Sequence, residues 1–143
     1  MKIGVPKEIK PQEHRIGLTP DSVKTLISEG HEVLVENNGG FEAGFDNDQY
    51  TSGGAKIVNK AEDIFNDADI IVKVKEPQPK EVEMIRENQI VYTYLHLAAA
   101  KELTAGLIKS KGVCIAYETV TDDNGRLPLL APMSAVAGRM SVQ

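Results

Sequence analysis

The sequence has 143 residues, of which 41% are hydrophobic and 26% are charged, a composition typical of one globular domain. A net charge of −5 and scattered lysines argue against nucleic acid or an anionic membrane as the main partner. The single cysteine, Cys114, excludes an internal disulfide, no apolar run is long enough to span a bilayer, and no signal peptide is recognisable. We therefore expect a cytoplasmic protein.

Strand and helix patterns alternate along the chain. Strands are predicted at residues 2–5, 32–36, 55–58, 68–74 and 113–117, with a further strand from about residue 91 that ends at His96. Helices are predicted from Pro20 to Gly30 with Thr19 as the N-cap, at 46–52, after a cap at Asn59, at 79–86, at 101–109, and from about Ser134. This alternation predicts an α/β fold with a mostly parallel sheet and helices on both faces.

Polar side chains follow four of the predicted strands. They are Arg15, Lys75, His96 and Glu118. Because the carboxyl ends of parallel strands meet at one edge, where open α/β sheets bind ligands, we expect these side chains to lie near one another. Lys73 falls on the same face as Lys75, so the alternative for one of the two lysines is simply to reach solvent.

An arginine, a lysine and a histidine at one sheet edge suit a small 2-oxo or 2-amino acid. The fork of Arg15 matches a carboxylate, Lys75 would stabilise a carbonyl oxygen, and His96 would move a proton near neutral pH. Each residue also has a plainer interpretation: a surface arginine, a strand-end lysine that reaches water, and a histidine whose ring bonds to the backbone. No CxxC, HxxxH or GxSxG pattern occurs, so neither a metal site nor a serine hydrolase is predicted.

Six blocks of sequence, in order and without a visible gap, resemble the amino-terminal region of the alanine dehydrogenase family. The blocks are MKIGVPKEIKPQEHRIGLTP, GHEVLVENNGG, DIIVKVKEP, YLHLAAA, IAYETV and LPLLAPMSAVAGRM. The related alpha subunit of proton-translocating nicotinamide nucleotide transhydrogenase shares the opening and the general fold. It lacks the KEP and HLAAA segments, so these two blocks favour alanine dehydrogenase.

The resemblance implies a Rossmann-like substrate domain of an enzyme that uses NAD to interconvert L-alanine with pyruvate and ammonia. By the resemblance, Arg15 and Lys75 bind the substrate, His96 is the catalytic acid and base, and Met133 and Ser134 lie near the substrate and the nicotinamide end of NAD. It also implies a homo-oligomer, typically a hexamer. Glu8 and Glu118 are candidates only for holding the geometry of other residues.

Two features depart from the family pattern. Ala135 stands where relatives usually carry an acidic residue, which puts a cofactor or interdomain contact in doubt. No GxGxxG motif for dinucleotide binding occurs, and the family's catalytic aspartate lies in a part of the protein not represented here. The last predicted helix also stops without a cap. We therefore expect residues 1–143 to be an amino-terminal substrate domain, incomplete at its carboxyl end and inactive alone.

Two alternatives remain open. One is a fragment of a transhydrogenase-type subunit. The other is a non-catalytic remnant that binds a small 2-oxo acid or pairs with full-length subunits.

Overall fold

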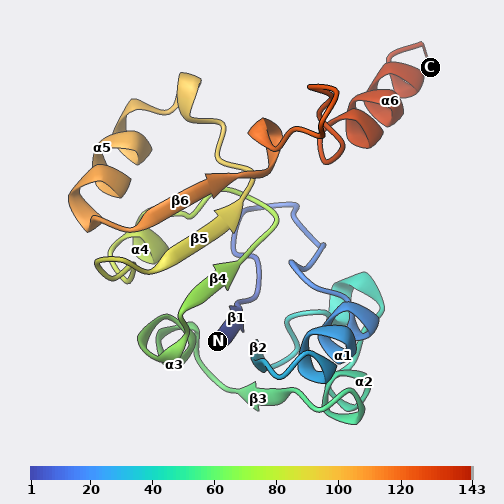
Figure 1. Cartoon of the computed structure of the whole chain (residues 1–143), viewed down its shortest axis with the longest axis vertical. Helices are drawn as coiled ribbons and strands as arrows, with labels where there is room; N and C mark the ends of the chain where they lie inside the picture. The colour runs from blue at the N-terminus through green and yellow to red at the C-terminus, as the bar shows by residue number, and fades with distance from the viewer. Residues whose placement is uncertain (143) are drawn as a thin grey trace.

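The computed structural model describes residues 1–142 and contains one six-stranded sheet (Figure 1). The strands are β1 (Lys2–Val5), β2 (Glu32–Glu36), β3 (Lys56–Val58), β4 (Ile70–Val72), β5 (Ile90–Thr93) and β6 (Val113–Ala116). Every pair of neighbours is parallel, in the order β3-β2-β1-β4-β5-β6. The predicted α/β fold with a parallel sheet is confirmed.

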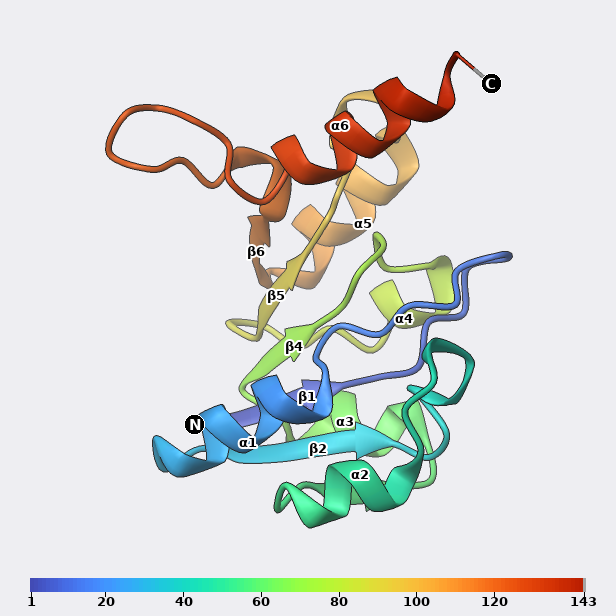
Figure 2. The ribbon, with the colours of Figure 1, turned by 90° about the vertical axis from the view of Figure 1, so that its right-hand side faces the viewer.

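Within residues 1–142, six α-helices and three short 3-10 helices connect and follow the strands. Figures 1 and 2 show their arrangement. The α-helices are α1 (Pro20–Ser28), α2 (Asn47–Ser52), α3 (Ala61–Asp67), α4 (Pro79–Val82), α5 (Lys101–Ser110) and α6 (Ala131–Met140). The 3-10 helices are η1 (Phe41–Ala43), η2 (Leu97–Ala99) and η3 (Tyr117–Thr119).

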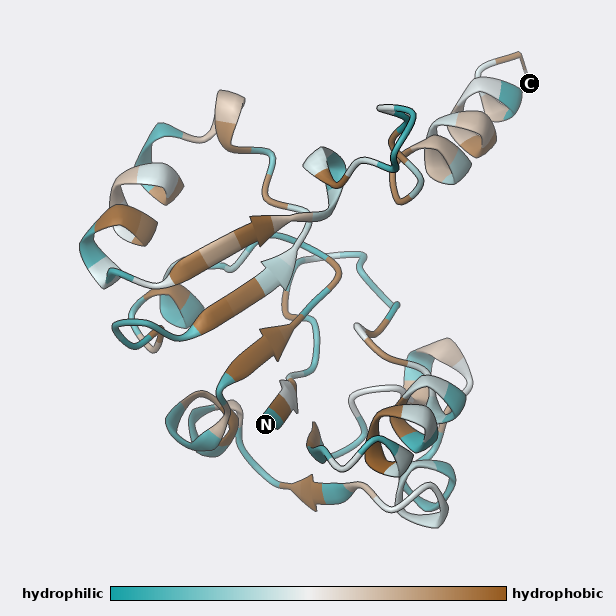
Figure 3. Cartoon of the chain, viewed as in Figure 1, coloured by the Kyte–Doolittle hydropathy of each residue, from teal (hydrophilic) through white to brown (hydrophobic). Residues whose placement is uncertain are grey.

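Helices cover both faces of the sheet. Successive residues of a strand point to opposite faces, so apolar strand residues form one core with helices on each side. Val33 and Val35 of β2 face a core with Val23 of α1 and Tyr50 of α2. Leu34, between them, faces the other core. That second core contains Ile64 and Phe65 of α3, Ile71 of β4, Val91 of β5 and Leu107 of α5. Apolar colour accordingly concentrates on the strands in Figure 3.

The direction of strand addition reverses between β1 and β4. From β1 the chain adds β2 and β3 on one side, and from β4 it adds β5 and β6 on the other. In open α/β sheets such a reversal leaves a crevice outside the carboxyl ends of the two central strands, and ligands bind there. The loops after β1 and β4, which carry Arg15 and Lys75, flank this crevice.

Several predicted boundaries need correction. Thr19 caps α1 as predicted, since its hydroxyl accepts from the Ser22 N–H at 3.3 Å. Asn59 is not a cap: the N-cap of α3 is Lys60, in extended backbone. The helix predicted to run to residue 86 is one turn that ends at Val82.

The remaining corrections concern residues near the sheet edge. β4 covers only Ile70–Val72 and β5 ends at Thr93, so His96 lies three residues beyond the strand. The terminal helix begins at Ala131, one turn before Ser134.

Helix α6 extends away from the sheet (Figures 1 and 2). Its apolar side chains are largely exposed, including Val136 at 56% and Met140 at 65%. Within residues 1–142, no helix combines the length and the apolar character needed to cross a bilayer.

Candidate active site

The loop that carries Arg15 packs directly against the end of β4. Gly17 makes this possible, because a Cβ atom at this residue would lie 2.5 Å from the Val72 carbonyl oxygen. No side chain larger than hydrogen fits there without moving one of the two backbones. The close approach brings the β1 loop beside the residues that follow Val72 in the chain.

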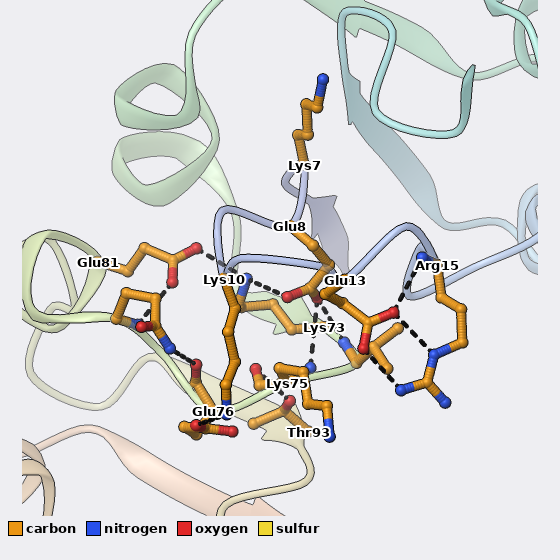
Figure 4. A network of polar contacts seen from close by, with 12 residues as sticks. Lys7, Glu8, Lys10, Glu13, Arg15, Lys73, Lys75, Glu76, Glu81 and Thr93 are labelled. Atoms are coloured by element: carbon orange, nitrogen blue, oxygen red, sulfur yellow. Dashed lines mark hydrogen bonds and ion pairs between the residues drawn. The ribbon is translucent and has the colours of Figure 1, made fainter. Parts of the chain in front are cut away.

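Arg15 is held from one side by a carboxylate of its own loop. Glu13 accepts hydrogen bonds from the Arg15 Nε at 2.8 Å, from Nη2 at 2.7 Å and from the backbone N–H at 2.9 Å (Figure 4). Nη1 lies 3.4 Å from the sulfur of Met133. Glu13 therefore occupies the Nε side of the guanidinium and leaves the Nη1–Nη2 end as the face on which a second carboxylate can bind.

The Lys75 segment is held through its backbone. The Glu8 carboxylate accepts the Val74 N–H at 2.6 Å and the Lys75 N–H at 3.4 Å, and the Thr93 hydroxyl donates to the Lys75 carbonyl at 2.8 Å. Among residues 1–142, no side chain forms an ion pair with the Lys75 ammonium, which Figure 4 shows without a bonded partner. The ammonium is thus available to a ligand.

Lys73 has a different environment, although it lies only two residues earlier. Its side chain is 0% exposed, and its ammonium is 3.2 Å from Glu8 and 2.7 Å from Glu81. Burial raises the pKa of Glu8, although the Lys73 charge and the Val74 N–H act in the opposite direction. Of the two lysines, Lys73 is therefore the structural one and does not reach solvent.

His96 adopts the left-handed backbone conformation, with φ 51° and ψ 39°. The Glu118 carboxylate accepts its N–H at 2.7 Å and the N–H of Leu95 at 3.1 Å. The imidazole stacks on the Tyr94 ring, with 6.3 Å between ring centroids and 17° between planes. The Tyr94 hydroxyl in turn donates to the Leu129 carbonyl, just before α6.

Arg15 and His96 are each linked to the segment around the start of α6: Arg15 contacts Met133, and His96 stacks on Tyr94, whose hydroxyl donates to the Leu129 carbonyl. Burial raises the pKa of Tyr94; the charge of Arg15 opposes this increase, and the charge of Glu118 adds to it. The pKa of Glu13 falls to about 2, chiefly through the Arg15 hydrogen bond, with a smaller contribution from the Lys75 charge. Arg15, Lys75 and His96 follow β1, β4 and β5, whose carboxyl ends lie at the same edge of the parallel sheet.

The two residues predicted near the cofactor lie in the first turns of α6. Met133 is half-buried against Arg15, whereas Ser134 is exposed and donates its backbone N–H to Leu130. Sequence reasoning missed Glu13 and Tyr94. Their signal is spacing: each lies two residues before a predicted site residue, which places alternate side chains of an extended segment on one side.

The described residues do not form a cradle for the pyrophosphate of a dinucleotide. Such a cradle needs glycines at a turn from a strand into a helix N-terminus. β1 leads instead into a long loop, and the glycine pair after β2 is filled by protein: a Cβ at Gly40 would lie 2.7 Å from the Tyr50 hydroxyl. Within residues 1–142, no three His, Cys, Asp or Glu side chains group as metal ligands either.

Comparison with known proteins shows the family. The profile of the family described as "Alanine dehydrogenase/PNT, N-terminal domain" matches residues 4–137. The chain belongs to this family.

The relatives are consistent with that assignment. The alanine dehydrogenases of Bacillus subtilis and Halomonas elongata are 54% and 50% identical to this chain over its whole length. A solved L-alanine dehydrogenase superposes on the whole chain with a TM-score of 0.94 at 52% identity. A transhydrogenase from Sinorhizobium meliloti superposes on 82% of the chain with a TM-score of 0.77 at 27% identity.

The chain spans less than two fifths of these relatives. It covers 37% of the Bacillus subtilis protein, 38% of the Halomonas elongata protein and 39% of the solved L-alanine dehydrogenase.

Proposed function

We propose that this chain is the substrate domain of an NAD-dependent oxidoreductase that interconverts L-alanine with pyruvate and ammonia. The observation that carries the proposal is that Arg15, Lys75 and His96 follow β1, β4 and β5, whose carboxyl ends share one edge of the sheet at the reversal between β1 and β4. Identity of about 50% to alanine dehydrogenases along the whole chain supports it.

The three side chains divide the recognition of a 2-oxo acid among them. The Nη1–Nη2 end of Arg15 would bind the carboxylate through two hydrogen bonds. The Lys75 ammonium would donate to the oxygen of pyruvate, or to the carboxylate beside it. His96 would accept a proton from the water that adds to the imino carbon and return it to the departing ammonia. In the reverse direction the same proton transfers run backwards.

A bound NAD would supply the hydride acceptor. We propose that its main binding site lies outside residues 1–142, because these residues offer no pyrophosphate cradle. In this proposal Met133 and Ser134 of α6 contribute only near the nicotinamide end. We further propose a cytoplasmic homo-oligomer, by analogy with the family. Residues 1–143 would then form the amino-terminal substrate domain, completed by further chain, and would not turn over alanine alone.

The test uses a hybrid enzyme in which residues 1–143 replace the corresponding part of the Bacillus subtilis alanine dehydrogenase. We expect alanine-dependent NADH formation from the hybrid and none from residues 1–143 alone. His96→Ala should lower the turnover of the hybrid by about 10²–10⁴-fold, the usual contribution of a general acid or base.

His31→Ala is the matched control, because His31 lies at the opposite end of the sheet, where its ring is 3.5 Å from the amino terminus. It should leave turnover unchanged. Near-normal turnover in the His96→Ala hybrid would remove His96 from the mechanism, and NADH formation by residues 1–143 alone would contradict the division between substrate and cofactor domains.

The structural likeness to a transhydrogenase makes a fragment of such a subunit the second candidate. The lower identity, 27% against 52%, and the KVKEP and HLAAA segments make it weaker. Hydride transfer to NADP by a complex of this chain with a transhydrogenase partner, without alanine oxidation by the hybrid, would favour it.

A further inference from the structure

The end of β6 lies beside the segment that follows β5 and contains His96. The parallel register pairs Thr93 of β5 with Ala116 of β6. If this register is continued for two residues beyond each strand, Leu95 lies opposite Glu118. Glu118 belongs to η3, the 3-10 helix that follows β6. Glu118 therefore lies beside the segment after β5, just beyond the last backbone pair between β5 and β6.

At that place the Glu118 carboxylate replaces the missing strand partner. One oxygen accepts the N–H of His96 at 2.7 Å and that of Leu95 at 3.1 Å, and the other lies 3.2 Å from the Leu95 nitrogen. Burial acts to raise the pKa of Glu118, but the N–H groups of His96, Glu118 and Leu95 together lower it below its usual value. The carboxylate is thus kept charged by the groups it holds.

The bonded backbone has an unusual conformation. At φ 51° His96 is left-handed, which is unfavourable for a residue with a Cβ and persists only where surrounding groups impose it. This turn lies three residues after β5, and the imidazole is nearly parallel to the Tyr94 ring, with 17° between the planes. An extended backbone at residue 96 would direct the ring elsewhere.

We propose that Glu118 is the positioning residue for His96. Its carboxylate fixes the Leu95–His96 backbone in the left-handed turn that aims the imidazole at the substrate region, without touching the substrate. This inference rests on the proposed role of His96 and adds the group that sets its geometry.

The first measurement concerns the backbone alone and uses residues 1–143. Amide hydrogen exchange, followed by NMR, should accelerate at Leu95 and His96 by about tenfold or more in Glu118→Gln, since the charged acceptor is lost. Val91, inside β5, should keep its protection. Glu102→Gln is the control, because Glu102 is an exposed acidic residue in the first turn of α5. Unchanged exchange at Leu95 and His96 would overturn the proposal.

The second measurement concerns catalysis and uses the hybrid enzyme. Glu118→Gln should lower kcat by about 10–100-fold, the loss typical of a misplaced catalytic group, with KM changed far less. Glu118→Asp, which keeps the charge, should recover part of kcat. In the His96→Ala background, Glu118→Gln should have no further effect, because no imidazole remains to position.

These results separate the two hypotheses. An equal loss of kcat with and without His96 would overturn the positioning role while leaving the function of His96 intact. Full turnover in the His96→Ala hybrid would instead overturn the role of His96, and the exchange data would still report on the turn. If neither Glu118→Gln nor Glu118→Asp folds, the carboxylate is structural and the proposal is wrong.

Discussion

Two groups of polar residues near the carboxyl edge of the sheet differ in burial, although Lys73 of one group and Lys75 of the other are only two residues apart. The buried ion cluster consists of Lys73, Glu8 and Glu81, whose side chains are 0–2% exposed, and the Lys73 ammonium pairs with both carboxylates. The rim residues are Arg15, Lys75 and His96, which follow the carboxyl ends of strands and are exposed or half-buried. Lysines at positions 73 and 75 therefore have different tasks: one satisfies buried carboxylates, and the other remains available to a ligand.

The pKa values of Glu8 beside Lys73 and of Glu13 and Glu118 at the rim shift in opposite directions. Burial raises the pKa of Glu8 and also that of Glu36, which accepts the Lys7 N–H nearby. At the rim, hydrogen bonds from Arg15 lower the pKa of Glu13 to about 2, and backbone N–H groups lower that of Glu118. Desolvation therefore dominates at Glu8 and Glu36, whereas at Glu13 and Glu118 the hydrogen-bond donors together outweigh desolvation.

The largest expected effect is on stability, from Lys73→Met. Removing the ammonium leaves Glu8 and Glu81 buried without their cation, which should reduce the free energy of unfolding by about 3–5 kcal/mol. Urea denaturation of residues 1–143 at neutral pH measures the loss. Lys75→Met is the matched control and should cost less than about 1 kcal/mol. Equal losses in the two variants would remove the distinction between cluster and rim.

The next effect is on substrate binding, from Arg15→Lys in the hybrid enzyme. A lysine keeps the charge but loses the two-pronged geometry, and a hydrogen bond to a charged group contributes about 1.5–3 kcal/mol. The KM for alanine should therefore rise about 10–100-fold, with little change in kcat. Arg126→Lys, in an exposed loop, should change neither constant. A lower kcat at constant KM would assign Arg15 a role other than binding the carboxylate.

The alternation of strands and helices was predictable because it depends on local apolar patterns. The parallel sheet, the N-cap at Thr19 and the placement of Arg15, Lys75 and His96 after strands all follow from such patterns. The residues at which the strands end did not follow from these patterns. β4 and β5 end two residues before Val74 and Leu95, whose N–H groups bond to Glu8 in the loop after β1 and to Glu118 in η3.

Those glutamates explain why the predicted strands were too long. Glu8 and Glu118 are distant in sequence from the backbone they bind, so alternation in residues 68–74 or 91–96 cannot reveal them. The burial of Lys73 was missed for the same reason. A lysine after an apolar run resembles a strand end that reaches water until its two carboxylate partners are placed.

A smaller effect at the rim concerns the titration of Glu13. In Arg15→Gln the guanidinium donors are lost, so the pKa of Glu13 should rise from about 2 toward the ordinary 4.5. NMR detection of the Glu13 side-chain carboxyl during an acid titration measures this change. Because the folded pKa is depressed, the stability supplied by this pair is present above pH 4.5 and is lost as the pH falls toward 2. A titration unaffected by the substitution would mean that Arg15 does not hold Glu13 in solution.

The smallest effect concerns Glu8, whose contribution to stability changes with pH in the direction opposite to that of Glu13. The folded pKa of Glu8 is raised, so the folded chain binds more protons than the unfolded chain between pH 4.5 and the folded pKa. The contribution of Glu8 to stability is therefore complete below pH 4.5 and is lost as the pH rises through the folded pKa. Glu8→Gln should flatten this decline, and the Lys73 charge keeps the effect modest, because it favours ionised Glu8.

Glu36 contributes in the same direction as Glu8, so part of the decline should remain in the Glu8→Gln variant. Urea denaturation at several pH values between 4 and 8 measures the slope, with exposed Glu29→Gln as the control. An unaltered slope in Glu8→Gln would show that Lys73 outweighs desolvation at Glu8. In that case, donors and cations would outweigh desolvation in the cluster as they do at the rim, and the carboxylates of both regions would be charged.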